Sequence, residues 1–364
     1  MNRPQNKILV IRGGAIGDFI LTLPVLAALR RQFPQSRLEV LGYPHIAQLA
    51  LAGGLVDAVR SIEARALAGF FAAGNTLTAD LADYFAGFAL ILSYLYDPDG
   101  VFQTNVARCS QVQFIAGPHR PDEHGARHAT EVLLQPLERL AIFDPDPAPK
   151  LTLVPRTLPL TPPHEPGAVE AAFQPASQGG LLPPGWEAGL TGSQGWLPPQ
   201  RGDAGRAPGS ERSLLALHLG SGSERKNWPE PHWAELLRHG VAATALNLLL
   251  VGGEAEGGRL DRLARCLPPS RVCLARSLPL ADLAAALNAS TAFVGHDSGI
   301  THLAVALGVP ALVLWGETNE AVWSPRGDRV TLLRHPEGLA NLPVSVVARH
   351  LSDLLAGPSA SLPG

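Results

Sequence analysis

Short apolar runs that alternate with helical stretches constrain this chain more than any other feature. The first run covers residues 7–12, and a glycine loop and a helical stretch reaching residue 31 follow it. Further runs at 38–41 and 90–94 continue the pattern. Strands that alternate with helices form βαβ units around a parallel sheet. The sequence therefore predicts a doubly wound α/β fold, in which ligands bind outside the carboxyl ends of the strands.

A segment rich in proline and glycine divides the chain. Residues 155–212 contain 11 Pro and 10 Gly among 58 residues, without a repeat. This composition is typical of a disordered linker or a long surface insertion. The alternation resumes after it, with strands expected at 214–219, 246–251, 272–274, 291–294 and 311–315. We therefore expect a domain at 1–155, a disordered linker or insertion at 156–211, a second domain at 212–342, and a helix and tail at 343–364.

The composition excludes several classes of protein. The formal net charge is −3, which argues against a general nucleic-acid binder. Three cysteines without a CxxC pair argue against a disulfide scaffold and a structural zinc site. No apolar run approaches the roughly 18 residues that span a bilayer, and the run at 8–11 is too short for a secretory signal. We expect a soluble cytoplasmic protein, compatible with peripheral contact at the inner face of the plasma membrane.

The first glycine loop places a carboxylate at the mouth of a strand–helix turn. Gly13, Gly14 and Gly17 allow another molecule to approach the backbone closely. The loop lacks both GxGxxG and Gly-Lys-Ser/Thr, so a dinucleotide site and a P-loop are disfavoured. Asp18 then has two interpretations. It either accepts backbone N–H groups at the start of the helix or acts as a general base toward an incoming hydroxyl.

Residues 296–302 have the pattern of an anion-binding helix N-terminus. Ser298 is a natural N-cap, and the free N–H groups behind it can bind a diphosphate. Asp297 with Thr301, and Ser298 with His302, are each four residues apart and share one side of the first turn. Asp297 would accept hydrogen bonds from sugar hydroxyls. The alternative is a capped, buried helix in which His302 belongs to the core.

A serine- and glycine-rich loop follows the strand at 214–219. Its glycines, among them Gly222, let the backbone curl around a ligand, and Ser221 offers a hydroxyl. Lys226 is one of only three lysines and supplies a point charge suited to phosphate, although an ordinary solvated lysine fits the same sequence. After the next strand, Glu256 lies where a ribose diol could bind.

Two Asp-Pro-Asp sequences, at 97–99 and 144–146, offer paired carboxylates to a divalent metal. Their prolines make turns the better interpretation, so we expect no metal and no cofactor. Without a metal, a departing nucleoside diphosphate must be neutralised by Lys226, Arg225 and helix N–H groups.

Taken together, the motifs resemble glycosyltransferase family 9, the ADP-heptose:lipopolysaccharide heptosyltransferases. The similarity keeps the family's order over roughly 5–155 and 212–335. It rests on Gly17-Asp18 with Thr22-Leu23-Pro24, on the loop running to Lys226, Trp228 and Pro229, on Gly252-Gly253 with a following Glu, and on 297–303.

This resemblance implies a GT-B fold, with two Rossmann-like domains facing a cleft, and metal-independent inverting transfer of heptose from ADP-heptose to a lipopolysaccharide-core acceptor. Domain 1–155 would carry the glycolipid or glycan acceptor, and 212–342 the nucleotide sugar. The family's last helix commonly packs on the first domain, as 344–355 would here. By the same resemblance, Asp18 would be the base, Ser221, Gly222 and Lys226 would hold phosphates, Glu256 the nucleoside, and Asp297, Ser298, Gly299, Thr301 and His302 the diphosphate and donor sugar.

The chain departs from the family pattern at two places. Family members often have His-Pro-Gly where this chain has His218-Leu219-Gly220, and Gly-Pro-Thr-Asp where it has Gly316-Glu317-Thr318-Asn319. The second loop lies near the expected donor. Two alternatives therefore stay open: a nucleotide-sugar epimerase of the same fold, and a catalytically degenerate nucleotide-sugar binding protein.

Overall fold

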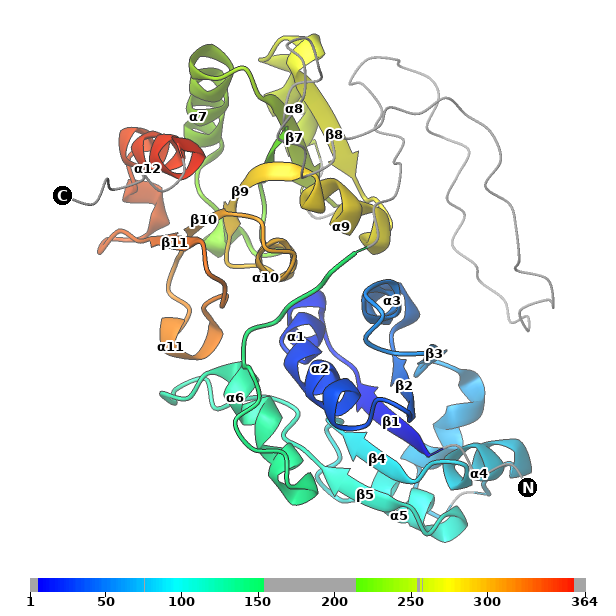
Figure 1. The fold of residues 1–364 in the computed structure, drawn as a ribbon. Helices are drawn as coiled ribbons and strands as arrows, with labels where there is room; N and C mark the ends of the chain where they lie inside the picture. The colour runs from blue at the N-terminus through cyan, green and yellow to red at the C-terminus, as the bar shows by residue number, and fades with distance from the viewer. Residues whose placement is uncertain (1–5, 75, 154–213, 254–255, 257, 357–364) are drawn as a thin grey trace.

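Parallel strands form two separate sheets, one in each half of the chain (Figure 1). The computed structural model describes residues 6–74, 76–153, 214–253, 256 and 258–356. The predicted linker or insertion at 156–211 and the tail beyond residue 356 lie outside the described residues. Among the described residues, no helix is long and apolar enough to cross a membrane.

The N-terminal sheet has five parallel strands in the order β3-β2-β1-β4-β5. Alternate residues of β1 enter two different cores: Val10 packs with one apolar cluster, and Leu9 and Ile11 pack with another. Both faces of the sheet are therefore covered, as a doubly wound fold requires. The strands are β1 (Lys7–Arg12), β2 (Arg37–Gly42), β3 (Ala58–Ser61), β4 (Leu90–Ser93) and β5 (Gln113–Ala116). The helices are α1 (Ile16–Ile20), α2 (Leu23–Gln32), α3 (Pro44–Ala52), α4 (Ala79–Ala86), α5 (Val101–Cys109) and α6 (Ala129–Leu134), with 3₁₀ turns at Arg65–Phe71 and Gln135–Leu140.

The C-terminal sheet has six parallel strands in the order β11-β10-β9-β6-β7-β8. Each sheet reverses its direction of winding once, between β1 and β4 in the first domain and between β6 and β9 in the second. Ligands bind at such switch points in open α/β sheets. The strands are β6 (Leu214–His218), β7 (Asn247–Gly252), β8 (Val272–Arg276), β9 (Ser290–His296), β10 (Ala311–Leu314) and β11 (Val330–Leu333). The helices are α7 (Glu230–Ala243), α8 (Arg259–Arg265), α9 (Leu280–Asn288), α10 (Gly299–Ala306), α11 (Glu320–Trp323) and α12 (Val344–Ala356).

Most predicted elements are present, but one predicted helix is divided. The helical stretch expected to reach residue 31, with a kink or a helix start at Thr22-Leu23-Pro24, forms α1 and α2, with a turn at Leu21 and Thr22 between them. Pro24 has no N–H to continue the first helix but is well placed in the first turn of the second. The Thr22 hydroxyl donates a hydrogen bond to the carbonyl of Asp18 (2.8 Å) and stabilises the break.

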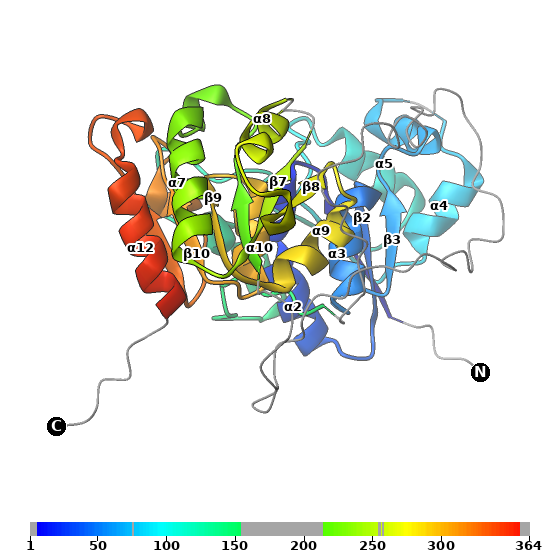
Figure 2. The same ribbon diagram turned by 90° about the horizontal axis from the view of Figure 1, so that it is seen from above.

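The last helix corrects one expectation from the family resemblance. Helix α12 packs on α7 and the C-terminal sheet, far from β2 and β3 of the first domain (Figures 1 and 2). Its buried face includes Val347 and Leu351, which share an apolar cluster with Trp233 and Leu236 of α7. Because this amphipathic face finds its apolar partner in the second domain, the expected packing on the first domain is wrong.

The two domains meet through their helices. Helix α1 contacts α10, and α3 contacts α9 (Figure 1). The contact between α1 and α10 is made at glycines. A Cβ atom on Gly299 would lie 2.7 Å from the backbone nitrogen of Gly17 and 2.9 Å from Cβ of Ile16. The close approach of these helices therefore depends on the missing side chain of Gly299.

We predict that Gly299→Ala loosens this contact, because the new methyl group meets backbone that cannot move aside. Amide hydrogen exchange measured by mass spectrometry should become faster in peptides covering α1 and the first turn of α10. Gly17→Ala is the matched control, since its Cβ would lie 3.5 Å from Cα of Gly299, an ordinary contact. Equal protection in Gly299→Ala and the unsubstituted protein would contradict the proposed close packing.

Candidate active site in the interdomain cleft

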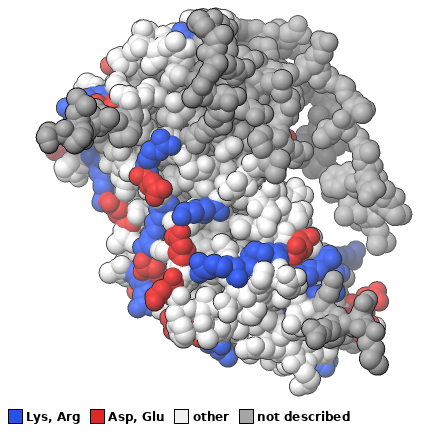
Figure 3. Space-filling view, viewed as in Figure 1, with Lys and Arg blue, Asp and Glu red and all other residues white. Residues whose placement is uncertain are grey.

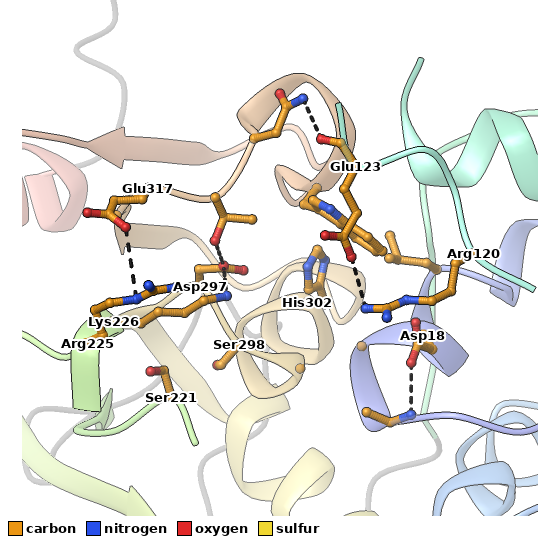
Figure 4. Close-up of a pocket in the computed structure, with 18 of the residues that line it drawn as sticks. Asp18, Arg120, Glu123, Ser221, Arg225, Lys226, Asp297, Ser298, His302 and Glu317 are labelled. Atoms are coloured by element: carbon orange, nitrogen blue, oxygen red, sulfur yellow. Dashed lines mark hydrogen bonds and ion pairs between the residues drawn. The ribbon is translucent and has the colours of Figure 1, made fainter. Parts of the chain in front are cut away.

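A cavity of about 620 Å³ lies between the domains, at the carboxyl ends of the strands (Figure 4). Loops after β1 and β5 form one wall, and loops after β6, β9 and β10 form the other. The cavity thus spans both switch points. It brings together eight of the residues predicted from sequence: Gly17, Asp18, Ser221, Lys226, Asp297, Ser298, Gly299 and His302.

Asp18 combines the two interpretations that the sequence left open. It lies in the first turn of α1, and its Oδ2 accepts a hydrogen bond from the N–H of Ala15 (2.9 Å). Its side chain is 24% exposed and also lines the cavity. One carboxylate therefore stabilises the helix start and faces the space where a substrate would bind. Gly14, whose φ is +103°, makes this turn possible, since a Cβ there would lie 2.7 Å from Oδ2.

Arg12, which the sequence analysis did not single out, contacts both the carboxylate and the backbone carbonyl of Asp18. Its side chain is buried, and its Nη2 lies 3.5 Å from Oδ1 of Asp18. The same guanidinium donates hydrogen bonds to the carbonyl of Asp18 (3.3 Å) and to that of His119 (2.8 Å). Burial lowers the pKa of Arg12, and the charge of Asp18 opposes that shift. An arginine that ends a buried strand, directly before a glycine loop, was the signal available in the sequence.

The opposite wall centres on an ion pair. Lys226 donates to Oδ2 of Asp297 (2.7 Å), and Thr318 donates its hydroxyl hydrogen to the same oxygen (2.6 Å). The Asp297 side chain is 10% exposed, whereas that of Lys226 is 35% exposed. Because one lysine N–H is taken by Asp297, two remain for a ligand. This wall therefore offers a fixed carboxylate and an accessible cation side by side.

Helix α10 begins at this wall with the predicted cap. Ser298 accepts a hydrogen bond from the N–H of Thr301 (3.3 Å), and its hydroxyl lies 3.2 Å from Nδ1 of His218. Thr301 does not line the cavity, because its hydroxyl donates to the carbonyl of His296. Thr301 therefore stabilises the start of the helix through its hydrogen bond to His296. Ser298, Gly299 and His302 line the cavity.

The remaining predicted residues lie outside the cavity lining. Glu256 accepts a hydrogen bond from the N–H of Gly253 (2.6 Å) and lies directly against Gly220. Glu256 therefore lies after β7, outside the cavity lining, and its contact with a nucleoside stays a prediction. Gly13, Gly14 and Gly222 likewise do not line the cavity.

Further polar and charged residues complete the cavity, and among those described next the sequence analysis assigned only Arg225 to the site. Arg120 pairs with Glu123 (3.1 Å) on the first wall. On the second wall, Arg225 lies 4.0 Å from Glu317. Asn319 crosses the cleft and donates to the carbonyls of Glu123 and Gly125 (both 3.0 Å). For Glu317 and Asn319, the sequence feature that could have indicated a place in the site was the departure from the family's Gly-Pro-Thr-Asp sequence at 316–319.

The Asp-Pro-Asp sequences lie in turns, as predicted. The Asp97 carboxylate accepts from the N–H groups of Phe102 and Gln103 at the start of α5. Asp146 pairs with Lys150 (2.7 Å). Within the described part of the chain, no three His, Cys, Asp or Glu side chains gather as a metal site. On the face shown in Figure 3, basic and acidic side chains lie interspersed, without a broad patch of one sign.

Neutral histidines surround the cavity floor. Burial lowers the pKa of His218 to about 4 and that of His296 to about 3. Burial also lowers the pKa of His302 to about 4, although Asp297 and Asp18 both act in the opposite direction. His296 uses its neutral ring as an acceptor, from the N–H of Trp228 (2.8 Å). At neutral pH the three side chains therefore carry no charge, and His218 and His296 orient the loops through hydrogen bonds.

Two Rossmann-like domains that face one cleft define a GT-B fold, and solved structures agree. A glycosyltransferase family 9 structure from Veillonella parvula has a TM-score of 0.67 at 16% identity, covering 98% of this chain and 99% of that one. The E. coli ADP-heptose lps heptosyltransferase II has a TM-score of 0.67 at 15% identity, covering 96% and 98%.

Sequence comparison finds similarity to one family over part of the chain. A model described as glycosyltransferase family 9 (heptosyltransferase) matches residues 166–343. Lipopolysaccharide heptosyltransferase 1 of Pseudomonas aeruginosa is 42% identical over 106 residues, which cover 29% of this chain and 29% of that protein. The E. coli protein of the same name is 31% identical over 131 residues, 35% of this chain and 40% of that protein. Residues 166–343 of this chain are therefore similar to glycosyltransferase family 9.

We predict that the free energy of unfolding decreases as the pH falls below 6.5. The unfolded chain binds protons on its histidines near pH 6.5, whereas His218, His296 and His302 bind them in the folded state only near pH 3–4. Well below pH 6.5, each of the three histidines lowers the free energy of unfolding by at most about 1.4 kcal/mol per pH unit. Urea unfolding at pH 7.0, 6.0 and 5.5 measures the slope.

His218→Gln should reduce this slope by the share of one histidine, whereas His239→Gln, at an exposed position of α7, should leave it unchanged. A stability that is constant between pH 7.0 and 5.5 would show that the three histidines are not held neutral by burial.

Proposed function

We propose that this protein is a cytoplasmic inverting glycosyltransferase that moves heptose from ADP-heptose onto a hydroxyl of a lipopolysaccharide-core acceptor. One observation carries the proposal: a carboxylate from the first domain and a cation beside a helix N-terminus from the second line the same cavity. The relatives' names supply the substrate class, since they are lipopolysaccharide heptosyltransferases. The matched regions span only 29–40% of those relatives.

In the proposed reaction, the acceptor hydroxyl binds next to Asp18. As its oxygen bonds to the anomeric carbon, its proton passes to the Asp18 carboxylate. Ala15 and Arg12 hold that carboxylate in place, so its orientation is set before the substrate arrives. The bond between the anomeric carbon and the diphosphate oxygen breaks on the opposite side, so the configuration inverts.

The leaving ADP carries the charge that develops during this step. Lys226 has two free N–H donors for it, and Ser298 and Gly299 at the N-terminus of α10 line the same cavity. Arg225 on the same loop adds a second cation. We propose that these groups replace a divalent metal, in which case the rate in EDTA should equal the rate with added Mg²⁺. Asp297, fixed by Lys226 and Thr318, would accept hydrogen bonds from hydroxyls of the donor sugar.

The proposed acceptor is a glycolipid, so the protein would work at the inner face of the plasma membrane. Binding there would be peripheral, through the acceptor itself. Release of a free altered sugar without any acceptor would instead identify a nucleotide-sugar epimerase. Donor binding without transfer to any glycan would identify a binding protein.

We predict that Asp18→Asn lowers kcat for transfer by about 10²–10⁴-fold, because the amide cannot take the proton. The amide oxygen can still accept from the N–H of Ala15, so the helix start and the binding of ADP should survive. ADP release with heptose-free lipopolysaccharide as acceptor measures the rate, and calorimetry measures ADP binding. Asp353→Asn, on the exposed side of α12, is the control. A kcat of Asp18→Asn equal to that of the control would refute a base role for Asp18.

We predict that Lys226→Met weakens ADP binding by about 10–100-fold, because hydrogen bonds to charged groups contribute about 1.5–3 kcal/mol each. Asp297 keeps its hydrogen bond from Thr318 in this variant. Lys150→Met is the matched control, since Lys150 is 70% exposed and pairs only with Asp146. Calorimetric titration measures the Kd for ADP, and an unchanged Kd in Lys226→Met would exclude a contact between Lys226 and the phosphates.

A further inference from the structure

The loop after β4 presents an aromatic ring to solvent. Tyr96 is 71% exposed, the highest value among the large hydrophobic side chains of the described residues. His119, from the loop after β5, lies against it with ring centroids 4.6 Å apart and an angle of 56° between the rings. Neither residue has a role in the reaction described above. An exposed aromatic pair of this kind is costly to keep in water and often belongs to a binding surface.

The two loops that carry this pair are held rigidly. Asp97, next to Tyr96, caps α5 through both carboxylate oxygens. The N–H of Gly117 donates to the carbonyl of Ser93 (2.7 Å), and a Cβ on Gly117 would lie 2.6 Å from the Tyr94 ring. The missing side chain of Gly117 therefore lets the β5 loop lie on Tyr94, which brings His119 beside Tyr96. The pair is built by the fold, and little entropy is lost when a ligand binds to it.

The pair is also linked to the proposed base. Strands β1 and β4 flank the switch point of the first sheet, so the loops carrying Asp18 and Tyr96 leave from neighbouring strands. The guanidinium of Arg12 donates to the carbonyl of His119 (2.8 Å) and pairs with the carboxylate of Asp18 (3.5 Å). Arg120, the next residue, lines the cavity close to Asp18 (Figure 4). The aromatic pair therefore extends the first wall of the cleft outward from Asp18.

We propose that Tyr96 and His119 form an acceptor platform, on which a pyranose ring of the acceptor packs while its neighbour's hydroxyl reaches Asp18. The inference rests on the proposed function. A sugar ring has an apolar C–H face that suits an aromatic surface and hydroxyls around its edge that suit polar neighbours. Arg120, directly after His119, provides such a neighbour. The donor is excluded as occupant, because its proposed ligands all come from the second domain.

The test compares binding and turnover in Tyr96→Ala. The probe is heptose-free lipopolysaccharide with its acyl chains removed. Calorimetry without donor should show acceptor binding about tenfold weaker than in the unsubstituted protein, and the acceptor KM should rise by the same factor. The KM for ADP-heptose and kcat at saturating acceptor should stay within twofold. Tyr96→Phe should restore acceptor binding, since stacking needs only the ring.

Phe143→Ala is the control, because Phe143 is 65% exposed but, unlike Tyr96, belongs to no aromatic pair among the described residues. Acceptor binding by Tyr96→Ala equal to that of the control would overturn the platform and leave the proposed function standing. An equal rise in the KM values for donor and acceptor in Tyr96→Ala would also overturn the platform, because it would indicate a general loss of structure. If the unsubstituted protein neither binds nor glycosylates the probe, the proposed function fails, and the platform fails with it.

Discussion

The geometry of the cleft depends on the close contact between two helix starts. Because Gly299 in α10 has no side chain, it packs directly against the backbone of Gly17 and the side chain of Ile16 in α1. This contact places Asp18 and the N-terminus of α10 on facing walls of one cavity. A displacement of about 1 Å between reacting groups can reduce a rate by about 10²-fold. A glycine contact fixes the separation more tightly than a pair of long side chains would.

Charge is distributed between the walls according to the proposed chemistry. The first wall holds the Asp18 carboxylate beside the buried guanidinium of Arg12, which lies 3.5 Å from it and outside the cavity lining. The second wall holds a lysine with free donors and the N-terminus of a helix, both suited to a diphosphate. Between them, burial keeps three histidines neutral. The proposed proton acceptor, Asp18, thus lies on the first wall, and the proposed site for the leaving diphosphate lies on the second.

Local patterns predicted the parts of the site that depend on one strand and the loop after it. Asp18, Lys226 and the helix start at Ser298 each follow a buried strand, and their positions at the cavity could be predicted from that pattern. Arg12 could not, because its partner His119 lies 107 residues away and meets it only after β1 and β5 join one sheet. The inward turn of Thr301 and the packing of α12 on α7 also depend on tertiary contacts. The short, partly exposed strands β3, β5 and β11 were missed for lack of an apolar run.

The stereochemistry of the product distinguishes the proposed reaction from the alternatives. If Asp18 faces the acceptor and the opposite wall binds the diphosphate, as proposed, the acceptor oxygen displaces ADP in a single step. Proton NMR of the purified product, recorded against the nucleotide-linked donor, gives the configuration at the transferred anomeric carbon. The account predicts inversion. Retention would require a second displacement from the same side as the leaving group, and it would contradict a reaction shared between Asp18 and the α10 wall.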